Sequence, residues 1–267
     1  MDLAHALGIA LSAADQARTV VQQAFGRTQP IYLKHDRSPF TDADLAAERV
    51  IRATLSAAFP DHAIVGEELG AERVDSEYCW MVDPIDGTVS FINGLPFSAS
   101  LIALCHLGQP QVAVVDFPML DRRVTAVLGG GAWMDGQKLT VQEGFDPETS
   151  IVCHGDLYTF ALGGHASLYR QLEDELKFFR SYTDAFGHYL VCTGAASVVV
   201  DSAMEVWDAA APKLIVQEAG GTVACFNDVD DAHRLLMISG DPAGVAWVSQ
   251  RAELSGAQRI IDPTVTC

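Results

Sequence analysis

Basic residues are scarce in this chain of 267 residues. Only 17 residues are Lys or Arg, whereas 35 are Asp or Glu, so the formal net charge is −18. Proteins bind nucleic acids and anionic membranes largely through Lys and Arg side chains that neutralise phosphates. We therefore expect neither a nucleic acid nor a membrane surface as a partner.

Long apolar runs and closely spaced cysteines are also absent. No stretch approaches the roughly 20 apolar residues that a helix needs to cross a bilayer, and the chain opens without basic residues. The cysteines contain no Cys-x-x-Cys pair, which argues against a zinc clip or a dense disulfide framework. They are Cys79, Cys105, Cys153, Cys192, Cys225 and Cys267. We expect a cytoplasmic protein whose cysteines are reduced.

The hydrophobic content is high enough for a large folded core. Hydrophobic residues make up 49% of the chain and charged residues 19%, so intrinsic disorder is excluded. The order of helical and strand patterns predicts an α+β lobe at 1–145 and an α/β lobe at 146–267, packed together without a flexible linker. The second lobe is expected to supply Asp208 and the wall that contacts the substrate.

Hydrophobic periodicity predicts the individual elements. Helices are expected at 3–25, 42–59, 166–176 and 207–219, and Leu7 and Leu11 are among the apolar residues at helical spacing in the first. Strands are expected at 63–65, 78–82, 98–105, 111–115, 123–128, 150–154 and 198–200, and a closing strand–helix–strand pattern covers 235–261. Thr41 followed by Asp44 is typical of a capping box at a helix start.

The most informative stretch is Asp83-Pro84-Ile85-Asp86-Gly87-Thr88, which follows an apolar strand. The proline is expected to turn the chain, so that Asp86 falls close enough to Asp83 to share a divalent cation. Gly87 and Thr88 would begin a helix whose free N–H groups could hold a phosphate, while the Thr88 hydroxyl orients a water. A β-turn with two capping aspartates explains the local spacing equally well.

Acidic residues also occur at three further predicted element ends. These are Glu67 and Glu68 after a strand, Asp42 and Asp44 in the first turn of a helix, and Asp208 at a later helix start. Each position alone is explained by the helix dipole or by solubility. Together they indicate a protein that offsets its negative charge with metal ions.

These motifs resemble the inositol monophosphatase family of metal-dependent, lithium-sensitive phosphatases. The resemblance rests on Thr41-Asp42-Ala43-Asp44, Gly66-Glu67-Glu68, the stretch from Asp83 to Thr88, residues 131–139, Trp207-Asp208-Ala209-Ala210 and Glu218-Ala219-Gly220-Gly221. It implies the five-layered αβαβα sugar-phosphatase fold, a homodimer, and hydrolysis of small phosphate monoesters. The implied cofactor is Mg²⁺, with two to three ions per active site and Mn²⁺ as a substitute.

The resemblance also implies roles for single residues. The implied metal ligands are Glu67, Asp83 and the Ile85 carbonyl for the first ion, Asp83, Asp86 and Asp208 for the second, and Asp44 with Glu67 for a weaker third. Thr88 and Glu67 would activate the attacking water, and Asp44 would assist catalysis. Asp86, Gly87, Thr88 and Asp208 would contact the substrate. The chain lacks Gly-x-Ser-x-Gly and a Walker A loop, which agrees with a water nucleophile.

The choice of substrate depends on two more aspartates. Asp184, within the segment 181–189, resembles the histidinol-phosphatase branch, where an extra carboxylate could meet the substrate ammonium. A helix cap is the alternative role of Asp184. Asp201 matches a family acidic residue that contacts polar groups of the substrate. Histidinol phosphate is thus slightly favoured over inositol 1-phosphate, and an inactive metal-binding relative is a remote alternative.

Overall fold

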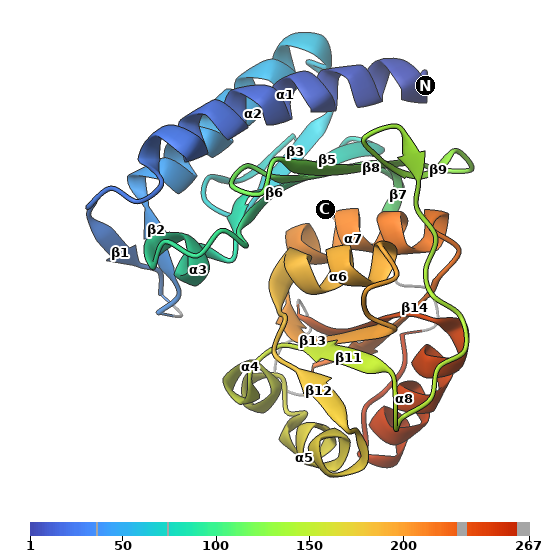
Figure 1. The fold of residues 1–267 in the computed structure, drawn as a ribbon. Coiled ribbons are helices and arrows are strands. Elements are labelled where there is room, and N and C mark those ends of the chain that lie inside the picture. Colours follow the sequence, from blue (N-terminus) through green and yellow to red (C-terminus); the bar gives the residue numbers. More distant parts are fainter. Residues whose placement is uncertain (36, 74, 229–233, 261–267) are drawn as a thin grey trace.

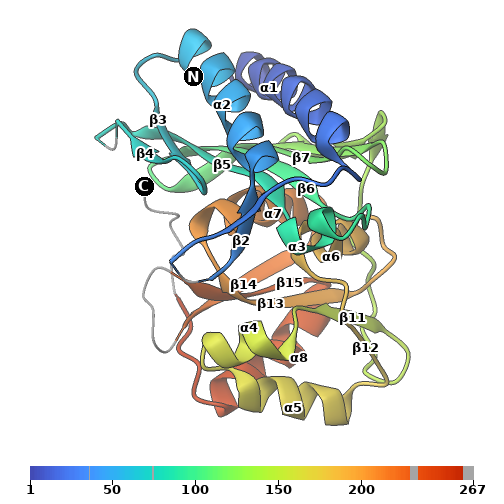
Figure 2. The same ribbon diagram turned by 90° about the vertical axis from the view of Figure 1, so that its left-hand side faces the viewer.

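The computed structural model describes residues 1–35, 37–73, 75–228 and 234–260. Its helices and two main sheets form five layers (Figure 1). The outer helices on one side are α1 (Leu3–Ala24) and α2 (Asp42–Ala58). The middle layer consists of α6 (Asp184–Cys192) and α7 (Val206–Glu218). The outer helices on the other side are α4 (Leu157–Leu162), α5 (Ala166–Glu175) and α8 (Pro242–Leu254) (Figure 2). The expected αβαβα fold is confirmed.

The first sheet lies between α1 and α2 on one face and the middle layer on the other. Its strands are β3 (Ala63–Gly66), β4 (Gly70–Glu72), β5 (Tyr78–Asp86), β6 (Ala99–His106), β7 (Gln109–Phe117), β8 (Arg122–Val127), β9 (Gly131–Met134) and β10 (Gln137–Lys138). Their order is β10-β9-β8-β7-β6-β5-β3-β4, and among neighbours only β3 and β5 are parallel. The short helix α3 (Thr88–Ile92) follows β5, and a hairpin of β1 (Ile31–Leu33) and β2 (Pro39–Thr41) joins α1 to α2.

The second sheet is mixed. Its strands are β11 (Ile151–His154), β12 (Phe178–Arg180), β13 (Val198–Met204), β14 (Thr222–Asn227) and β15 (Leu235–Gly240), in the order β12-β11-β13-β15-β14. β12, β11 and β13 are parallel neighbours, whereas β15 pairs antiparallel with both β13 and β14. The carboxyl ends of three adjacent strands therefore meet at one edge of this sheet.

Small residues set the packing of α1. Its buried face consists of Ala6, Ala10, Ala13, Ala14, Ala17 and Val21. Leu7 and Leu11, which lie at the predicted helical spacing, are half-buried at the margins of this face. Alanines allow α1 to approach α2 and the sheet closely, and the larger leucines fill the borders of the contact.

Helix α7 of the middle layer is largely buried. Residues 209–216 of α7 are all buried, because sheets lie on both sides of this helix. Although α6 and α7 come late in the sequence, α7 contacts β5, β6 and β7 of the first sheet. The predicted lobe boundary after residue 145 falls in the connection between β10 and β11 and stays a prediction.

Three local expectations need correction. Pro84 does not end the strand, because β5 continues to Asp86 through a shift in its pairing with β6. The second strand of the closing pattern is reduced to a single bridge between Arg259 and Phe226, and Ile261 lies outside the described residues. Cys105, Cys153, Cys192 and Cys225 are free and buried as expected, but Cys79 is disulfide-bonded. Cys267 also lies outside the described residues.

Within the described residues, no helix is both long and apolar enough to span a bilayer.

Candidate metal centre

Three predicted aspartates converge where the first sheet meets the middle layer. Asp83 and Asp86 come from β5, and Asp208 comes from the first turn of α7. One carboxylate oxygen from each lies within 4.8 Å of the others. Residues three apart on a regular strand point to opposite faces, but the shift in β5 between Asp83 and Asp86 turns both toward the same site.

The electrostatics of this cluster favour a bound cation. Burial raises the pKa values of Asp83, Asp86 and Asp208 well above their ordinary range, and neighbouring carboxylates raise them further. Gathering several carboxylates in a buried space is unfavourable without a compensating positive charge. Clustered carboxylate oxygens are also the ligands that hard divalent cations prefer. The donor set therefore fits Mg²⁺ or a similar ion.

Glu67 adds a fourth carboxylate next to Asp83. It follows β3, the strand parallel to β5, and its N–H donates to the Val82 carbonyl at 3.1 Å. The Glu67 side chain hydrogen-bonds to Asp83 and, with burial as the larger cause, raises the pKa of Asp83. The structure thus brings Glu67 to the edge of the three-aspartate cluster.

Lys34, which no sequence motif indicated, lies beside Glu67 at the edge of the three-aspartate cluster. Its Nζ atom is 2.7 Å from Glu67 Oε1 and 2.7 Å from Glu68 Oε1. Burial alone would lower the pKa of Lys34, but the two carboxylates raise it above its ordinary value. Burial raises the pKa of Glu68 to about 7. A positive charge is therefore already held beside Glu67.

Asp44 and Thr88 are brought together as expected. Asp44 is fully buried, and its Oδ2 accepts hydrogen bonds from the Thr41 N–H at 2.8 Å and the Thr41 hydroxyl at 2.6 Å. Its Oδ1 lies 3.5 Å from the Thr88 hydroxyl, which donates to the Ile85 carbonyl at 3.0 Å. Burial raises the pKa of Asp44.

Two site aspartates also fix the starts of helices. Asp44 completes the predicted capping box of α2 with Thr41. In the same way, Asp208 Oδ2 accepts the Glu205 N–H at 2.9 Å at the start of α7. Each carboxylate uses one oxygen for the helix and keeps the other for the site. The second arrangement escaped prediction because Glu205 is not one of the usual N-cap residue types.

A glycine is required between the metal cluster and α3. Gly87 has φ 76°, and a Cβ atom there would lie 3.0 Å from Asp184 Oδ2. As expected, α3 begins at Thr88. Asp86 Oδ2 accepts the Ala185 N–H at 2.6 Å, which ties the start of α6 to β5.

Asp184 and Asp201 lie beside the aspartate cluster. Asp184 is the first residue of α6, where its carboxylate accepts the Thr183 hydroxyl at 3.2 Å and faces Gly87. Asp201 is buried on β13. Mainly through burial, the pKa of Asp184 rises to about 6 and that of Asp201 to about 8. Their charges in turn contribute to the raised pKa of Asp86.

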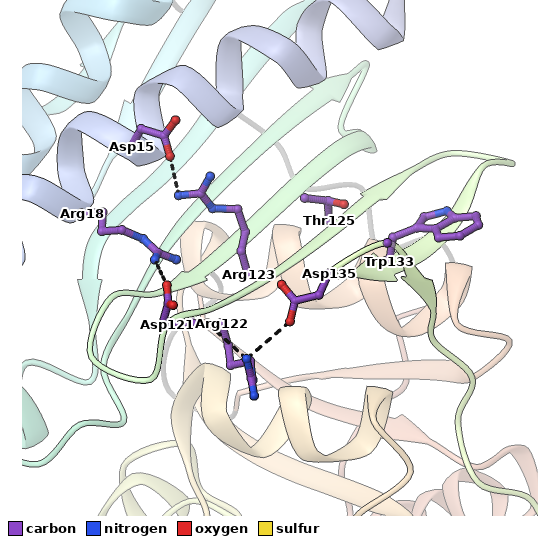
Figure 3. A pocket seen from close by; sticks show the side chains of 9 residues that line it. Asp15, Arg18, Asp121, Arg122, Arg123, Thr125, Trp133 and Asp135 are labelled. Atoms are coloured by element: carbon purple, nitrogen blue, oxygen red, sulfur yellow. Dashed lines mark hydrogen bonds and ion pairs between the residues drawn. The ribbon is translucent and has the colours of Figure 1, made fainter.

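Away from the aspartate cluster, a hollow of about 470 Å³ lies between α1 and the turns of β8 and β9 (Figure 3). Its three arginines are already paired: Arg18 with Asp121, Arg123 with Asp15, and Arg122 with Asp135. This hollow has no cation left over for a phosphate, and it contains none of the predicted site residues.

Comparison with known proteins identifies the family of this chain. The model of the inositol monophosphatase family matches residues 2–257. A protein named histidinol-phosphatase from Chlorobaculum parvum is 37% identical over 83% of this chain and 85% of its own length, and one from Mycobacterium tuberculosis is 36% identical over 85% and 90%. The solved structure of a Thermotoga maritima IMPase superposes with a TM-score of 0.81 at 26% identity, over 94% of this chain and all of that one.

The family match covers nearly the whole chain, and the histidinol-phosphatases are similar over most of theirs. The predicted ligands Asp83, Asp86 and Asp208 form one acidic cluster in a fold shared with solved inositol monophosphatases. The chain belongs to the inositol monophosphatase family of metal-dependent phosphatases.

Proposed function

We propose that this phosphatase uses Mg²⁺ to hydrolyse a small phosphate monoester and prefers histidinol phosphate. The observation that supports metal dependence best is the convergence of the Asp83, Asp86 and Asp208 oxygens within 4.8 Å. Glu67 and the Ile85 carbonyl are the further ligands proposed for two ions, and Asp44 is proposed to serve a weaker third. Mn²⁺ would use the same oxygens.

The chain's own groups can orient the reaction. When bound, Mg²⁺ would screen the charge of the phosphate and acidify the attacking water. The Thr88 hydroxyl, already directed by the Ile85 carbonyl, keeps lone pairs that can accept a hydrogen bond from that water. Glu67 would take its proton. The N–H groups at Gly87 and Thr88 would hold the phosphate oxygens.

The preference for histidinol phosphate rests on Asp184 and Asp201. Both carboxylates lie beside the aspartate cluster, where a substrate ammonium would relieve their mutual repulsion. Two relatives at 36–37% identity are named histidinol-phosphatase. Inositol 1-phosphate remains the alternative substrate, in view of the fold shared with an IMPase. An inactive metal-binding relative is a remote alternative, because all the expected side chains are present.

Phosphate release from histidinol phosphate, inositol 1-phosphate and other esters tests the activity. We expect turnover with Mg²⁺ and none after chelation by EDTA. Asp83→Asn should abolish turnover, since Asp83 is central to the cluster, whereas Asp44→Asn should cost about 10- to 100-fold. Undiminished activity in EDTA, or equal losses in the two variants, would contradict the proposed metal arrangement.

Asp184→Asn tests the preferred alcohol. If Asp184 pairs with an ammonium, this variant should lose about 5- to 150-fold in kcat/KM for histidinol phosphate, as is usual for an unpaired buried group. Its kcat/KM for inositol 1-phosphate should change little. An equal effect on both substrates would show that Asp184 only supports the start of α6, and inositol 1-phosphate would become the favoured substrate.

Resemblance to the family also suggests a homodimer and inhibition by Li⁺. The cysteine pattern suggests a cytoplasmic location, and the formal charge of −18 argues against a nucleic-acid partner. We propose these as properties of this chain. Sedimentation measures the oligomeric state, and titration of the phosphatase reaction with LiCl measures the inhibition.

A further inference from the structure

Three aspartates follow or occupy three adjacent parallel strands of the second sheet. In the order β12-β11-β13, Asp184 comes four residues after β12, Asp156 two residues after β11, and Asp201 lies on β13. The register pairs His154 with Val200, so the chain positions after each lie side by side. Ligands of sheets with parallel strands bind outside the carboxyl ends of those strands. All three carboxylates therefore belong to one sheet edge.

A contact at this edge brings the backbone next to Asp156 close to Asp201. A Cβ atom on Gly155 would lie 2.6 Å from Asp201 Oδ1, so the Asp201 carboxylate packs directly against the backbone that precedes Asp156. Burial is the main cause of the raised pKa values of Asp184 and Asp201, and the charge of Asp156 raises both further. The charges of Asp184 and Asp201 also raise the pKa of Asp86, so this edge of the sheet borders the metal cluster.

This edge differs from two other acidic places in the molecule, each of which holds a cation of the chain. Glu67 and Glu68 share Lys34, and Asp116 is paired with Arg18. Within the described residues, no Lys, Arg or His forms an ion pair with any of the three edge aspartates. Their hydrogen bonds come from a neighbouring hydroxyl and from backbone N–H groups. A positive charge is missing here, and a ligand would have to supply it.

We propose that Asp156 is a further specificity-determining residue, which forms with Asp184 and Asp201 a wall that selects phosphate esters of amino alcohols. The inference rests on the proposed function and deepens it, because it defines the substrate class by an ammonium group. Asp156 is the exposed member of the wall. Because Asp156 is exposed, its charge should affect the capture of the cationic substrate more than the chemical step.

The position of Asp156 allows a clean test of its charge. It is the N-cap of α4, and its Oδ1 accepts the Thr159 N–H at 2.8 Å. Asparagine caps helices as well as aspartate does, so Asp156→Asn removes the charge and keeps the cap. The matched control is Asp2→Asn, because Asp2 caps α1 by accepting the N–H groups of Ala4 and His5.

The experiment measures kcat and KM for histidinol phosphate and inositol 1-phosphate at low and high salt. For Asp156→Asn we expect kcat/KM for histidinol phosphate to fall about three- to fivefold, the size typical of an exposed charge pair, mainly through a higher KM. The loss should shrink in 0.5 M NaCl as ions screen the charge. Inositol 1-phosphate should be hydrolysed as by the wild type, and Asp2→Asn should change neither substrate.

The possible failures can be told apart. If the wild type prefers histidinol phosphate but Asp156→Asn is unchanged, or loses equally on both substrates, the role of Asp156 is refuted and the proposed function stands. If the wild type releases no phosphate or prefers inositol 1-phosphate, the proposed function is refuted, and the inference falls with it. A melting temperature of Asp156→Asn equal to that of the wild type shows that the cap is intact.

Discussion

Lys34 holds an ammonium group next to a proposed metal ligand. Its Nζ atom contacts Glu67 and Glu68 at 2.7 Å each, and Glu67 is also a proposed ligand of the first and third ions. One carboxylate cannot give its full charge to both a lysine and a divalent cation. Lys34 should therefore compete with the metal for Glu67.

Lys34→Gln should lower the Mg²⁺ concentration needed for half-maximal activity. Glutamine retains length and hydrogen-bonding capacity but removes the competing charge. Phosphate release measured across a Mg²⁺ titration gives the concentration, and Lys138→Gln, on exposed β10, is the control. A raised Mg²⁺ requirement in Lys34→Gln would mean that Lys34 helps to assemble the site.

Sequence motifs located the centre of the candidate site but not its margins. Asp83, Asp86 and Asp208 lie together as the motif order suggested. Lys34 and Asp156 were missed because neither belongs to a local pattern. Lys34 reaches Glu67 only through the hairpin geometry, and Asp156 nears Asp201 only because β11 and β13 are adjacent in the sheet.

At the scale of elements, a buried carboxylate fastens α1 to the first sheet. Asp116 on β7 is fully buried and accepts Arg18 Nη2 of α1 at 2.6 Å and Arg123 Nε of β8 at 2.6 Å. Arg18 extends from there to the exposed Asp121 (Figure 3). The two arginines are only about one-fifth exposed, so they depend on Asp116 for their charge balance.

Asp116→Ala should lower the free energy of unfolding by about 3 to 5 kcal/mol, because it leaves two partly buried arginines without their shared partner. Asp121→Ala, which removes an exposed partner of the same Arg18, should change it by less than about 0.5 kcal/mol. Urea denaturation of both variants measures the difference. Similar values for the two would show that Asp116 contributes no more than a surface charge.

Several of the longer elements were predictable, whereas the shortest were not. Apolar runs indicated β5, β6 and β7, and helical spacing indicated α1 and α2. Strands of two or three residues, such as β1, β4, β10 and β12, are too short to show a period, and tertiary pairing alone defines them. The shift within β5 also depends on its partner β6, so Pro84 by itself suggested a turn.

For the whole molecule, the acidic cluster couples stability to pH and metal. The folded-state pKa values of Asp184 and Asp201 are raised to about 6 and about 8, mainly by burial. A carboxyl group whose pKa is raised in the folded state contributes stability below its unfolded pKa, near 3.9, and this contribution is lost as the pH rises through the folded value. Metal-free protein should therefore lose stability between about pH 4 and pH 8.

The melting temperature of the protein in EDTA should fall as the pH is raised from 5.5 to 8.5, and Mg²⁺ should reduce the fall. Asp201→Asn should flatten the part of the profile between about pH 6 and pH 8, since it removes the group with the pKa of about 8. Differential scanning calorimetry measures both profiles. An unaltered slope in Asp201→Asn would show that Asp201 does not couple to folding in this range.

The burial of α7 between two sheets also determines where the molecule resists opening. Helix amides exchange with deuterium when a helix frays or unfolds, and α7 can do neither without disturbing a layer on each side. Its amides should be among the slowest to exchange, while those of α4 on the outer face exchange sooner. The first turn of α7 carries Asp208, so one proposed metal ligand is attached to a helix that we expect to be among the slowest to unfold locally.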